Sequence, residues 1–140
     1  MKKFFIQFAI FTCALFFCSG ALWAKGDKPA ETQTVYIFGV AASFGDTIMH
    51  FTEIQEIQGA GLVRKGFLEG RSLYSYQLKS YLENSKNLPN RTCTVFFSEK
   101  KSKLEKQYAK LKQRYQASKN LACHTLDAKT LSFEKYEPQY

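Results

Sequence analysis

The chain has 140 residues and a formal net charge of +8, with 45% hydrophobic and 23% charged residues. This length allows one domain with one hydrophobic core. Only two histidines and four cysteines are present, which excludes most of the usual arrangements of catalytic and metal-binding side chains.

Residues 1–24 have the three-part layout of a secretory signal peptide. Two lysines precede an apolar run of about fourteen residues that ends at Phe17, short of the roughly 18–20 needed to span a bilayer. We therefore expect cleavage after Ala21 or Ala24, a periplasmic or secreted protein, and no membrane insertion after cleavage. An uncleaved anchor and lipid attachment at Cys18 are the alternatives.

Removal of this segment changes both the charge and the cysteine count. It takes away two lysines and no acidic residue, so the net charge falls from +8 to +6. Cys93 and Cys123 remain, and an oxidising compartment would permit one disulfide between them. Both cysteines also fit buried strand positions as free thiols, so both alternatives stay open.

The polar, aperiodic stretch KGDKPAETQ, residues 25–33, predicts a flexible leader before a single domain over residues 34–140. TVYIFGVAA, which follows it, is apolar at successive positions, typical of a strand covered on both sides. Together with TIMHFTEIQEI it predicts a hairpin over Val35–Ile57 whose turn is SFGD.

The next stretch, Gln58–Arg71, contains four glycines and predicts an irregular loop. Loops of this length often carry binding sites, and this one holds the basic pair Arg64 and Lys65. Its letters GAGLVRKG resemble a phosphate-binding loop only superficially, because they do not lie between a strand and a helix.

A helix is expected to follow, with Ser72 as its N-cap and its end near Lys86. Its apolar face consists of Tyr74, Leu78, Tyr81 and Leu82. RTCTVFF, residues 91–97, is β-branched and aromatic and predicts a central strand, with Cys93, Val95 and Phe97 on one face.

The stretch 99–119 predicts a second helix, which carries eight basic and two acidic residues. The residues expected to dock it on the sheet are Leu104, Tyr108, Leu111 and Tyr115. LACHTL and TLSFEKY then predict two final strands. The fold class is therefore α+β, one mixed sheet with two helices in the order β-β-α-β-α-β-β.

The second helix alone accounts for the whole excess of positive charge, so the charge is a local patch. Its exposed row consists of Lys103, Lys106, Lys110 and Arg114. Such a row can attract an acidic protein, an acidic glycan or an anionic lipid surface. The alternative is a solvated helix whose lysine stems cover the flanks of the docking seam.

Nucleic acid is excluded as a partner by the expected export and by the lack of exposed aromatic residues between the cations.

The candidates for catalysis are few. Cys93 could act as a nucleophile with His50 as its base only if their strands and faces match. Cys123 and His124 are adjacent in a strand and should point to opposite faces. The spacing lacks the usual zinc patterns, and we expect no metal and no cofactor.

VYIFGVAASFGDTIMHFTEIQEI, YSYQLKSYL and PNRTCTVFF together resemble a family of small exported proteins of Bacteroidota bacteria that carry signal peptides. The resemblance covers nearly all of the mature chain and implies a bacterial envelope protein, but the family has no assigned activity. The alternation of strands and helices is also similar to the sporulation-related repeat, a peptidoglycan-binding module, from which the initial hairpin and the glycine-rich insertion depart.

The hypothesis with most support is a non-enzymatic interaction module whose contacts are the basic row and the loop Gln58–Arg71, with an acidic envelope component or protein as partner. A small thiol- or histidine-dependent enzyme and a purely structural envelope protein are the alternatives.

Overall fold

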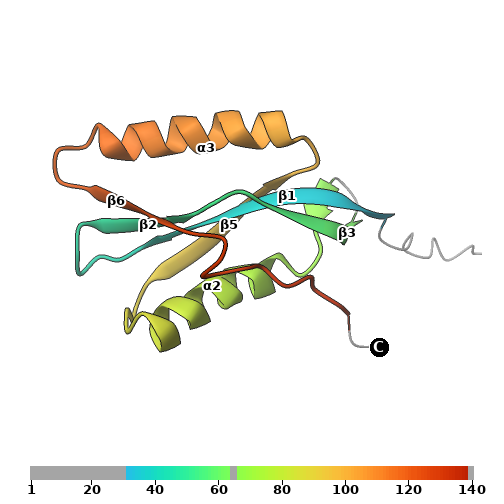
Figure 1. The fold of residues 1–140 in the computed structure, drawn as a ribbon, viewed down its shortest axis with the longest axis horizontal. Coiled ribbons are helices and arrows are strands. Elements are labelled where there is room, and N and C mark those ends of the chain that lie inside the picture. The colour runs from blue at the N-terminus through green and yellow to red at the C-terminus, as the bar shows by residue number, and fades with distance from the viewer. Residues whose placement is uncertain (1–30, 64–65, 139–140) are drawn as a thin grey trace, which may run out of the picture.

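The computed structural model describes residues 31–63 and 66–138 and has one mixed sheet with two helices (Figure 1). Its strands are β1 (Glu31–Ala42), β2 (Ile48–Thr52), β3 (Gln55–Val63), β4 (Phe67–Leu68), β5 (Thr92–Ser98) and β6 (Ala122–Leu126). Its helices are α2 (Arg71–Ser85) and α3 (Lys101–Gln116). The predicted α+β class and both helices are confirmed, and the strand order differs at two places.

The sheet is built around β1. β5 pairs antiparallel along one side of it, and β2 and β3 pair antiparallel along the other side, one after the other. β4 extends the sheet beyond β3, and β6 lies parallel to β2. The connection from β5 to β6 carries α3 across one face, while α2 covers the opposite face (Figure 1).

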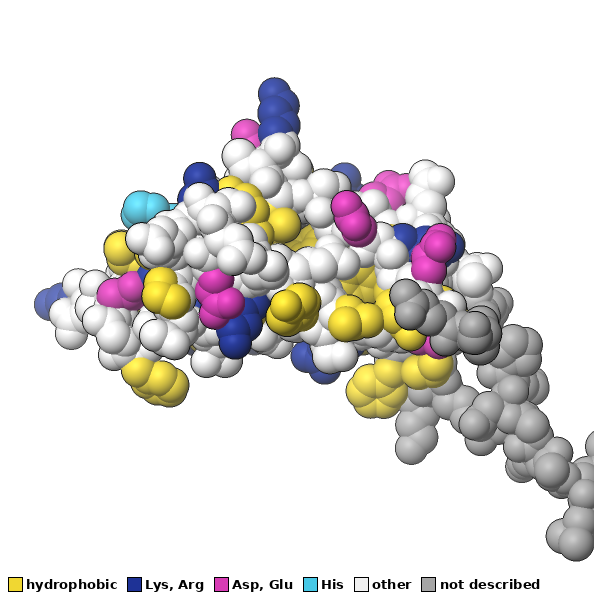
Figure 2. Space-filling model, turned by 90° about the horizontal axis from the view of Figure 1, so that it is seen from below, with side chains coloured by type: hydrophobic (Ala, Val, Ile, Leu, Met, Phe, Trp, Pro, Cys, Tyr) yellow, Lys and Arg dark blue, Asp and Glu magenta, His cyan; other side chains and the backbone are white. Residues whose placement is uncertain are grey.

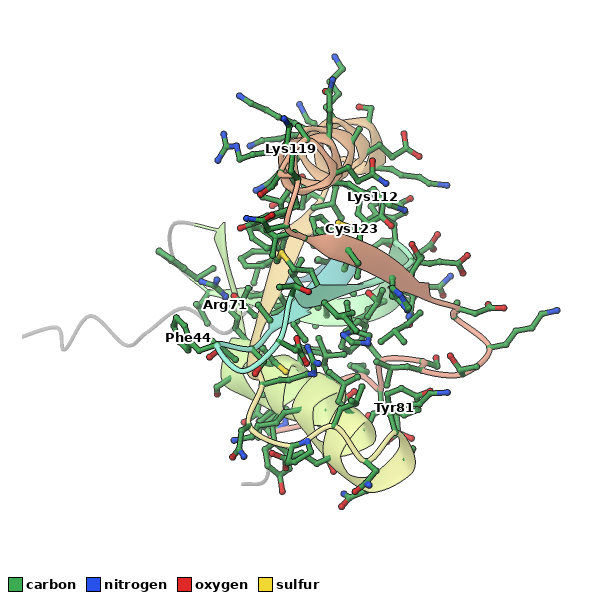
Figure 3. All side chains as sticks on the ribbon, turned by 90° about the vertical axis from the view of Figure 1, so that its left-hand side faces the viewer. Phe44, Arg71, Tyr81, Lys112, Lys119 and Cys123 are labelled. Atoms are coloured by element: carbon green, nitrogen blue, oxygen red, sulfur yellow. The ribbon has the colours of Figure 1, made fainter. Side chains whose placement is uncertain are left out.

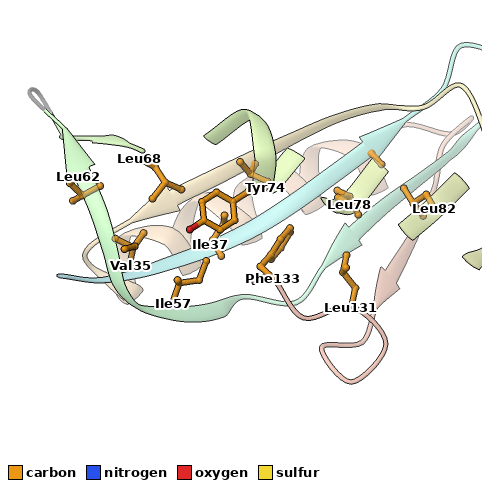
Figure 4. Packing of buried hydrophobic residues seen from close by; sticks show 13 residues of the cluster. Val35, Ile37, Ile57, Leu62, Leu68, Tyr74, Leu78, Leu82, Leu131 and Phe133 are labelled. Atoms are coloured by element: carbon orange, nitrogen blue, oxygen red, sulfur yellow. The ribbon is translucent and has the colours of Figure 1, made fainter. Parts of the chain in front are cut away.

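Successive residues of the strands point to opposite faces, as the pleat requires. Ile37 belongs to the core beneath α2, whereas its neighbour Phe38 belongs to the core beneath α3. The α2-side core is the larger (Figure 4) and consists of Val35, Ile37, Ala41, Ile57, Ala60, Leu62, Leu68, Tyr74, Leu78, Leu82, Val95, Leu131 and Phe133. The α3-side core consists of Phe38, Val40, Met49, Phe51 and Leu104.

The start of β1 lies earlier than predicted. β1 begins at Glu31 and pairs with β3 from there, so the last residues of the expected leader are strand. The rest of that leader and the predicted signal peptide lie outside the described residues.

The stretch Gln58–Arg71 is where the sequence analysis was wrong about local structure. The predicted strand TIMHFTEIQEI is divided into β2 and β3 after Thr52. The Thr52 hydroxyl accepts a hydrogen bond from the Gly39 amide at 2.8 Å and donates one to the Glu53 carbonyl at 3.0 Å. β3 then runs to Val63 and returns as β4, so most of the expected loop is a hairpin. The glycine at 59 has a positive φ of 67° and lies near a shift in the pairing of β1 with β3, which explains how a glycine-rich stretch remains in a strand.

The predicted apolar face of α2 is confirmed, because Tyr74, Leu78 and Leu82 are buried. Its predicted cap is wrong: Gly70, in the left-handed region with φ 67°, precedes the helix in place of Ser72. Gly39 allows α2 to approach closely, since a Cβ there would lie 2.7 Å from Leu78 Cδ2.

The predicted final strand TLSFEKY is wrong, because the chain forms no strand between β6 and Pro138. Leu131 and Phe133 are buried as an alternating pattern suggests, but their backbone groups form hydrogen bonds with side chains and not with a neighbouring strand. Gln55 donates to the Leu131 carbonyl at 2.7 Å and accepts from the Phe133 amide at 2.8 Å. Gln77 likewise donates to the Glu134 carbonyl at 2.9 Å and accepts from the Glu134 amide at 2.8 Å. Side-chain amides therefore replace a neighbouring strand.

Candidate interaction site

α3 docks on the sheet through the four predicted residues. Leu104 is fully buried, and Tyr108, Leu111 and Tyr115 pack half-buried against the same core. Tyr108 lies edge-on to Phe38, with ring centroids 5.0 Å apart. These four residues form the docking seam, and its position determines which way each flank of the helix faces.

One flank of α3 faces β6, because Lys112 Nζ donates to Thr125 Oγ1 of that strand at 2.8 Å. With about 100° between successive residues of a helix, Lys103, Lys110 and Arg114 fall on the other side of the seam. That flank faces β5. Figure 3 looks along α3 and shows Lys112 on the β6 side, with other nitrogen-tipped side chains projecting from the rest of the helix.

The basic row, by which we mean Lys103, Lys106, Lys110 and Arg114, is exposed at all four positions. No salt bridge joins any of the four to an acidic side chain within the part of the chain that the structure describes. Figure 2 shows the opposite, α2 side of the molecule, where acidic and basic side chains are interspersed. The positive charge is thus concentrated on the α3 side.

A cleft of about 360 Å³ lies where the β3–β4 hairpin meets the start of α3. Its lining residues are Leu62, Gly66, Phe97, Ser98, Glu99, Lys100 and Lys103. The two regions that the sequence analysis selected for contact therefore meet at one place, although Gly66 and Lys103 are 37 positions apart in the sequence.

The cleft, as defined by these residues, has a positive balance and a partly apolar wall. Lys100 and Lys103 are exposed at its edge. Glu99 is the one acidic lining residue among them, and its carboxylate accepts a weak hydrogen bond from Gln33 Nε2 at 3.4 Å. Such a surface can hold an acidic side chain beside an apolar group.

The two other residues selected from the sequence, Arg64 and Lys65, lie outside the described residues. They connect Val63 of β3 to Gly66, which lines the cleft. Their role in binding stays a prediction.

Sequence reasoning missed Phe97, Ser98 and Lys100 as lining residues of the cleft, and it placed Arg71 in the contact loop without assigning it a partner. Lys100 precedes α3 as its N-cap and was counted only in the total charge of the helix. Arg71 looked like the end of a loop, but it begins α2 and reaches across to β5. The contact of β5 with α2 depends on the fold as a whole and leaves no local pattern.

The disulfide allowed by the sequence is contradicted, because Cys93 and Cys123 are both free. Cys93 packs in the α2-side core and Cys123 in the α3-side core, so they point to opposite faces. They also lie on β5 and β6, with β1 and β2 between them. Three strand spacings are about 14 Å, and a disulfide requires Cα atoms within about 7 Å.

The pairing of Cys93 with His50 that the sequence left open fails because their strands are not adjacent. The sheet register places Cys93 beside Ala41, and Ala41 beside His50, so all three share a face while β1 separates the two reactive groups. Burial raises the pKa of the Cys93 thiol to about 11. A protonated, half-buried thiol is a poor nucleophile.

His50 and Arg91 are buried polar residues of a cluster that the sequence did not indicate, and Asp46 and His124 are its exposed members. Arg91 is 4% exposed, donates to the Ile48 carbonyl at 2.9 Å and forms a salt bridge with Asp46. The rings of His50 and His124 have centroids 5.8 Å apart. Burial, and then the Arg91 charge, hold the pKa of His50 below its usual value of 6.5. This cluster fastens the β1–β2 turn to the start of β5.

Within residues 31–63 and 66–138, no three histidine, cysteine or acidic side chains come together as metal ligands would. Over the same ranges, neither helix has the length and apolar character needed to cross a bilayer.

Comparison with known proteins gives no match: no family model, curated protein or solved structure is similar to this chain. The likeness to exported Bacteroidota proteins therefore stays a prediction.

Proposed function

We propose that this protein is an exported bacterial envelope protein, periplasmic or secreted, that acts as a non-enzymatic interaction module for an acidic partner. The contact surface is the basic row on α3 together with the cleft at its start.

One observation carries this proposal: four exposed cations lie on the side of α3 that the core does not use. Lys103 belongs to both the row and the cleft, so the two form a continuous surface. Lysines needed only for solubility have no reason to adjoin a cleft with an apolar wall. The raised pKa of the Cys93 thiol supports a binding role over thiol chemistry.

Charge reversal tests the surface. The variant K103E/K106E/K110E/R114E should lose salt-sensitive binding to a fluorescent peptide that alternates glutamate and valine. Anisotropy titrations at low and high salt measure the effect.

The matched control places the same change of net charge elsewhere, at Lys86, Lys119, Lys129 and Lys135, all of which are exposed. If both variants lose binding equally, the attraction is to overall charge and the proposed surface is wrong. If the first variant binds like the unchanged protein, the basic row has no role.

Export has its own test. The intact mass of the protein isolated from its cells should correspond to a chain that begins at Lys25 or Leu22, after cleavage at Ala24 or Ala21. A mass that retains the first 24 residues would contradict cleavage.

A further inference from the structure

The outer side of β5 is an edge of the sheet. Among the described residues, β5 pairs only with β1. In an antiparallel pair, alternate residues direct both their N–H and C=O groups away from the neighbouring strand. The question is which residues of β5 do so.

Two hydrogen bonds answer it. Gly39 is paired with Val95, and its amide donates to Thr52 of β2, so it does not point toward β5. The carbonyl of Val95 accepts from Arg71 Nη2, which approaches at 3.4 Å from α2. Val95 therefore directs its peptide groups outward, and by alternation Cys93 and Phe97 do the same.

This edge is covered at its centre and more open at its ends. Val95 is 0% exposed, with the Arg71 side chain at its carbonyl, whereas Cys93 and Phe97 are partly exposed. A strand that pairs along all of β5 therefore displaces the exposed Arg71 side chain from Val95. Within the described ranges, the Arg71 contact is the one hydrogen bond to an outward peptide group of Cys93, Val95 or Phe97. It is long for an N–H···O bond, and the guanidinium carbon also lies 5.9 Å from the centre of the Phe97 ring. Natural edges that are closed to partners usually have stronger protection, such as a covering loop or a proline.

The charged surface follows the same edge. The flank of α3 that carries Lys103, Lys110 and Arg114 faces β5, and the cleft begins at Phe97 and Ser98, where β5 ends. An extended segment lying along β5 would thus have cations beside it and a basic cleft at one end.

We propose that an extended acidic segment of a partner protein binds here as an added β-strand, with its backbone on β5 and its carboxylates at Arg71, the basic row and the cleft. The inference rests on the proposed function and specifies its partner. The outward peptide groups supply affinity, and the cations select acidic sequences.

A second copy of this chain fits the edge less well. Antiparallel pairing of β5 with its own copy would bring the two Arg71 guanidinium groups together, and each basic row would approach the other. Like charges at an interface oppose association. The acidic strand has no such conflict.

The decisive variant is Cys93→Pro, with Cys93→Ala as its match. Proline removes the outward N–H, which β1 does not use, and proline is tolerated at such edge positions. Cys93 lies at the end of β5 away from the cleft, so neither variant alters the basic surface. The probe is an acetylated and amidated peptide of seven residues, the length of β5, that alternates glutamate and valine.

We expect the proline variant to bind this peptide about five- to tenfold more weakly than the alanine variant, which should bind like the unchanged protein. Equal affinities of the two variants would overturn strand addition. If charge reversal of the basic row abolishes binding while proline has no effect, the proposed function holds and the strand inference fails. If neither change weakens binding, both are wrong.

A second measurement needs no variant. Amide hydrogen exchange by NMR should show Cys93 and Phe97, which are partly exposed, exchanging faster in the free protein than Thr94 and Phe96, whose amides bond with β1. Saturating peptide should slow Cys93 and Phe97 selectively. Uniform slowing along β5, or none, would contradict the added strand.

Discussion

The two faces of the sheet are covered in different ways. On the α2 side, three residues of the helix are buried, and the C-terminal segment adds Leu131 and Phe133. On the α3 side, Leu104 is the one buried residue of the helix, and the tyrosines beside it are only half-buried. The first helix is therefore embedded in a core, whereas the second lies on the sheet along a narrow seam.

Because of this difference, the α2 side mainly stabilises the fold, whereas the outer side of α3 presents charged residues to solvent. A helix attached by a narrow seam leaves most of its circumference in solvent, where cations can be placed without disturbing packing. The embedded helix has less freedom, because its neighbours enclose it. We expect substitutions on the α2 side to affect folding and substitutions on the outer side of α3 to affect binding.

The largest expected effect is that of Leu78→Ala. Leu78 is fully buried on the face of α2 that packs against the sheet, so its truncation should reduce the free energy of unfolding by about 2–5 kcal/mol. Urea denaturation measures the change. Leu73, on the same helix but 45% exposed, is the control, and Leu73→Ala should cost under about 1 kcal/mol. Similar costs for the two variants would refute an embedded α2.

Tyr108→Ala should have the next largest effect, about 1–3 kcal/mol, because the ring is half-buried and packs edge-on against Phe38 and Phe51. Tyr76→Ala, on the exposed side of α2, is the comparison and should cost less. A loss for Tyr108→Ala that exceeds the loss for Leu78→Ala would reverse the order of the two faces.

A smaller effect comes from His50 and depends on pH. Because the folded-state pKa of His50 lies below 6.5, the unfolded chain binds the proton first as the pH falls. Stability should therefore be lost as the pH drops below about 6.5 toward the folded-state value. The groups that face His50 are Asp46, Arg91 and His124.

Unfolding curves between pH 8 and about pH 5 test this, since that range stays above the ordinary carboxylate pKa values. The control is His50→Gln, which should make stability less dependent on pH over that range. An unchanged pH dependence in this variant would show that His50 is not the responsible group.

The smallest effect on stability is expected for the quadruple charge reversal of the basic row. Exposed charges contribute little to folding, so the free energy of unfolding should change by less than about 1 kcal/mol. Thermal melts beside the binding titrations provide the comparison. A large destabilisation would mean that the cations support the fold. The division between an α2 side for stability and an α3 side for binding would then be wrong.

Periodicity was enough to predict the fold class and the apolar faces of both helices. Tyr74, Leu78 and Leu82 repeat at helical spacing, and their burial follows from that local pattern. The same reasoning failed for Leu131 and Phe133, which alternate like strand residues. Their backbone groups bond with Gln55, a distant polar side chain that no local pattern identifies, and Gln77 does the same for the neighbouring Glu134.

The site was predictable in part. The charge of the basic row is a property of one helix and can be read from its spacing. The cleft depends on the position of the β3–β4 hairpin beside the start of α3, which is a property of the tertiary structure. Cys93 and Cys123 show the same limit: an even count suggested a bridge, and only the tertiary structure places them three strands apart and on opposite faces.

The positions of the chain ends affect how the molecule can be attached. β1 enters the sheet at the end where the β3–β4 hairpin and the start of α3 lie, and Pro138 leaves near that same end (Figure 1). The β1–β2 turn, with its exposed Phe44, points the other way. A surface linker joined directly to the start of β1 or to Pro138 would therefore leave the sheet at the end that carries the cleft, and immobilisation through the turn would leave the cleft accessible to large partners.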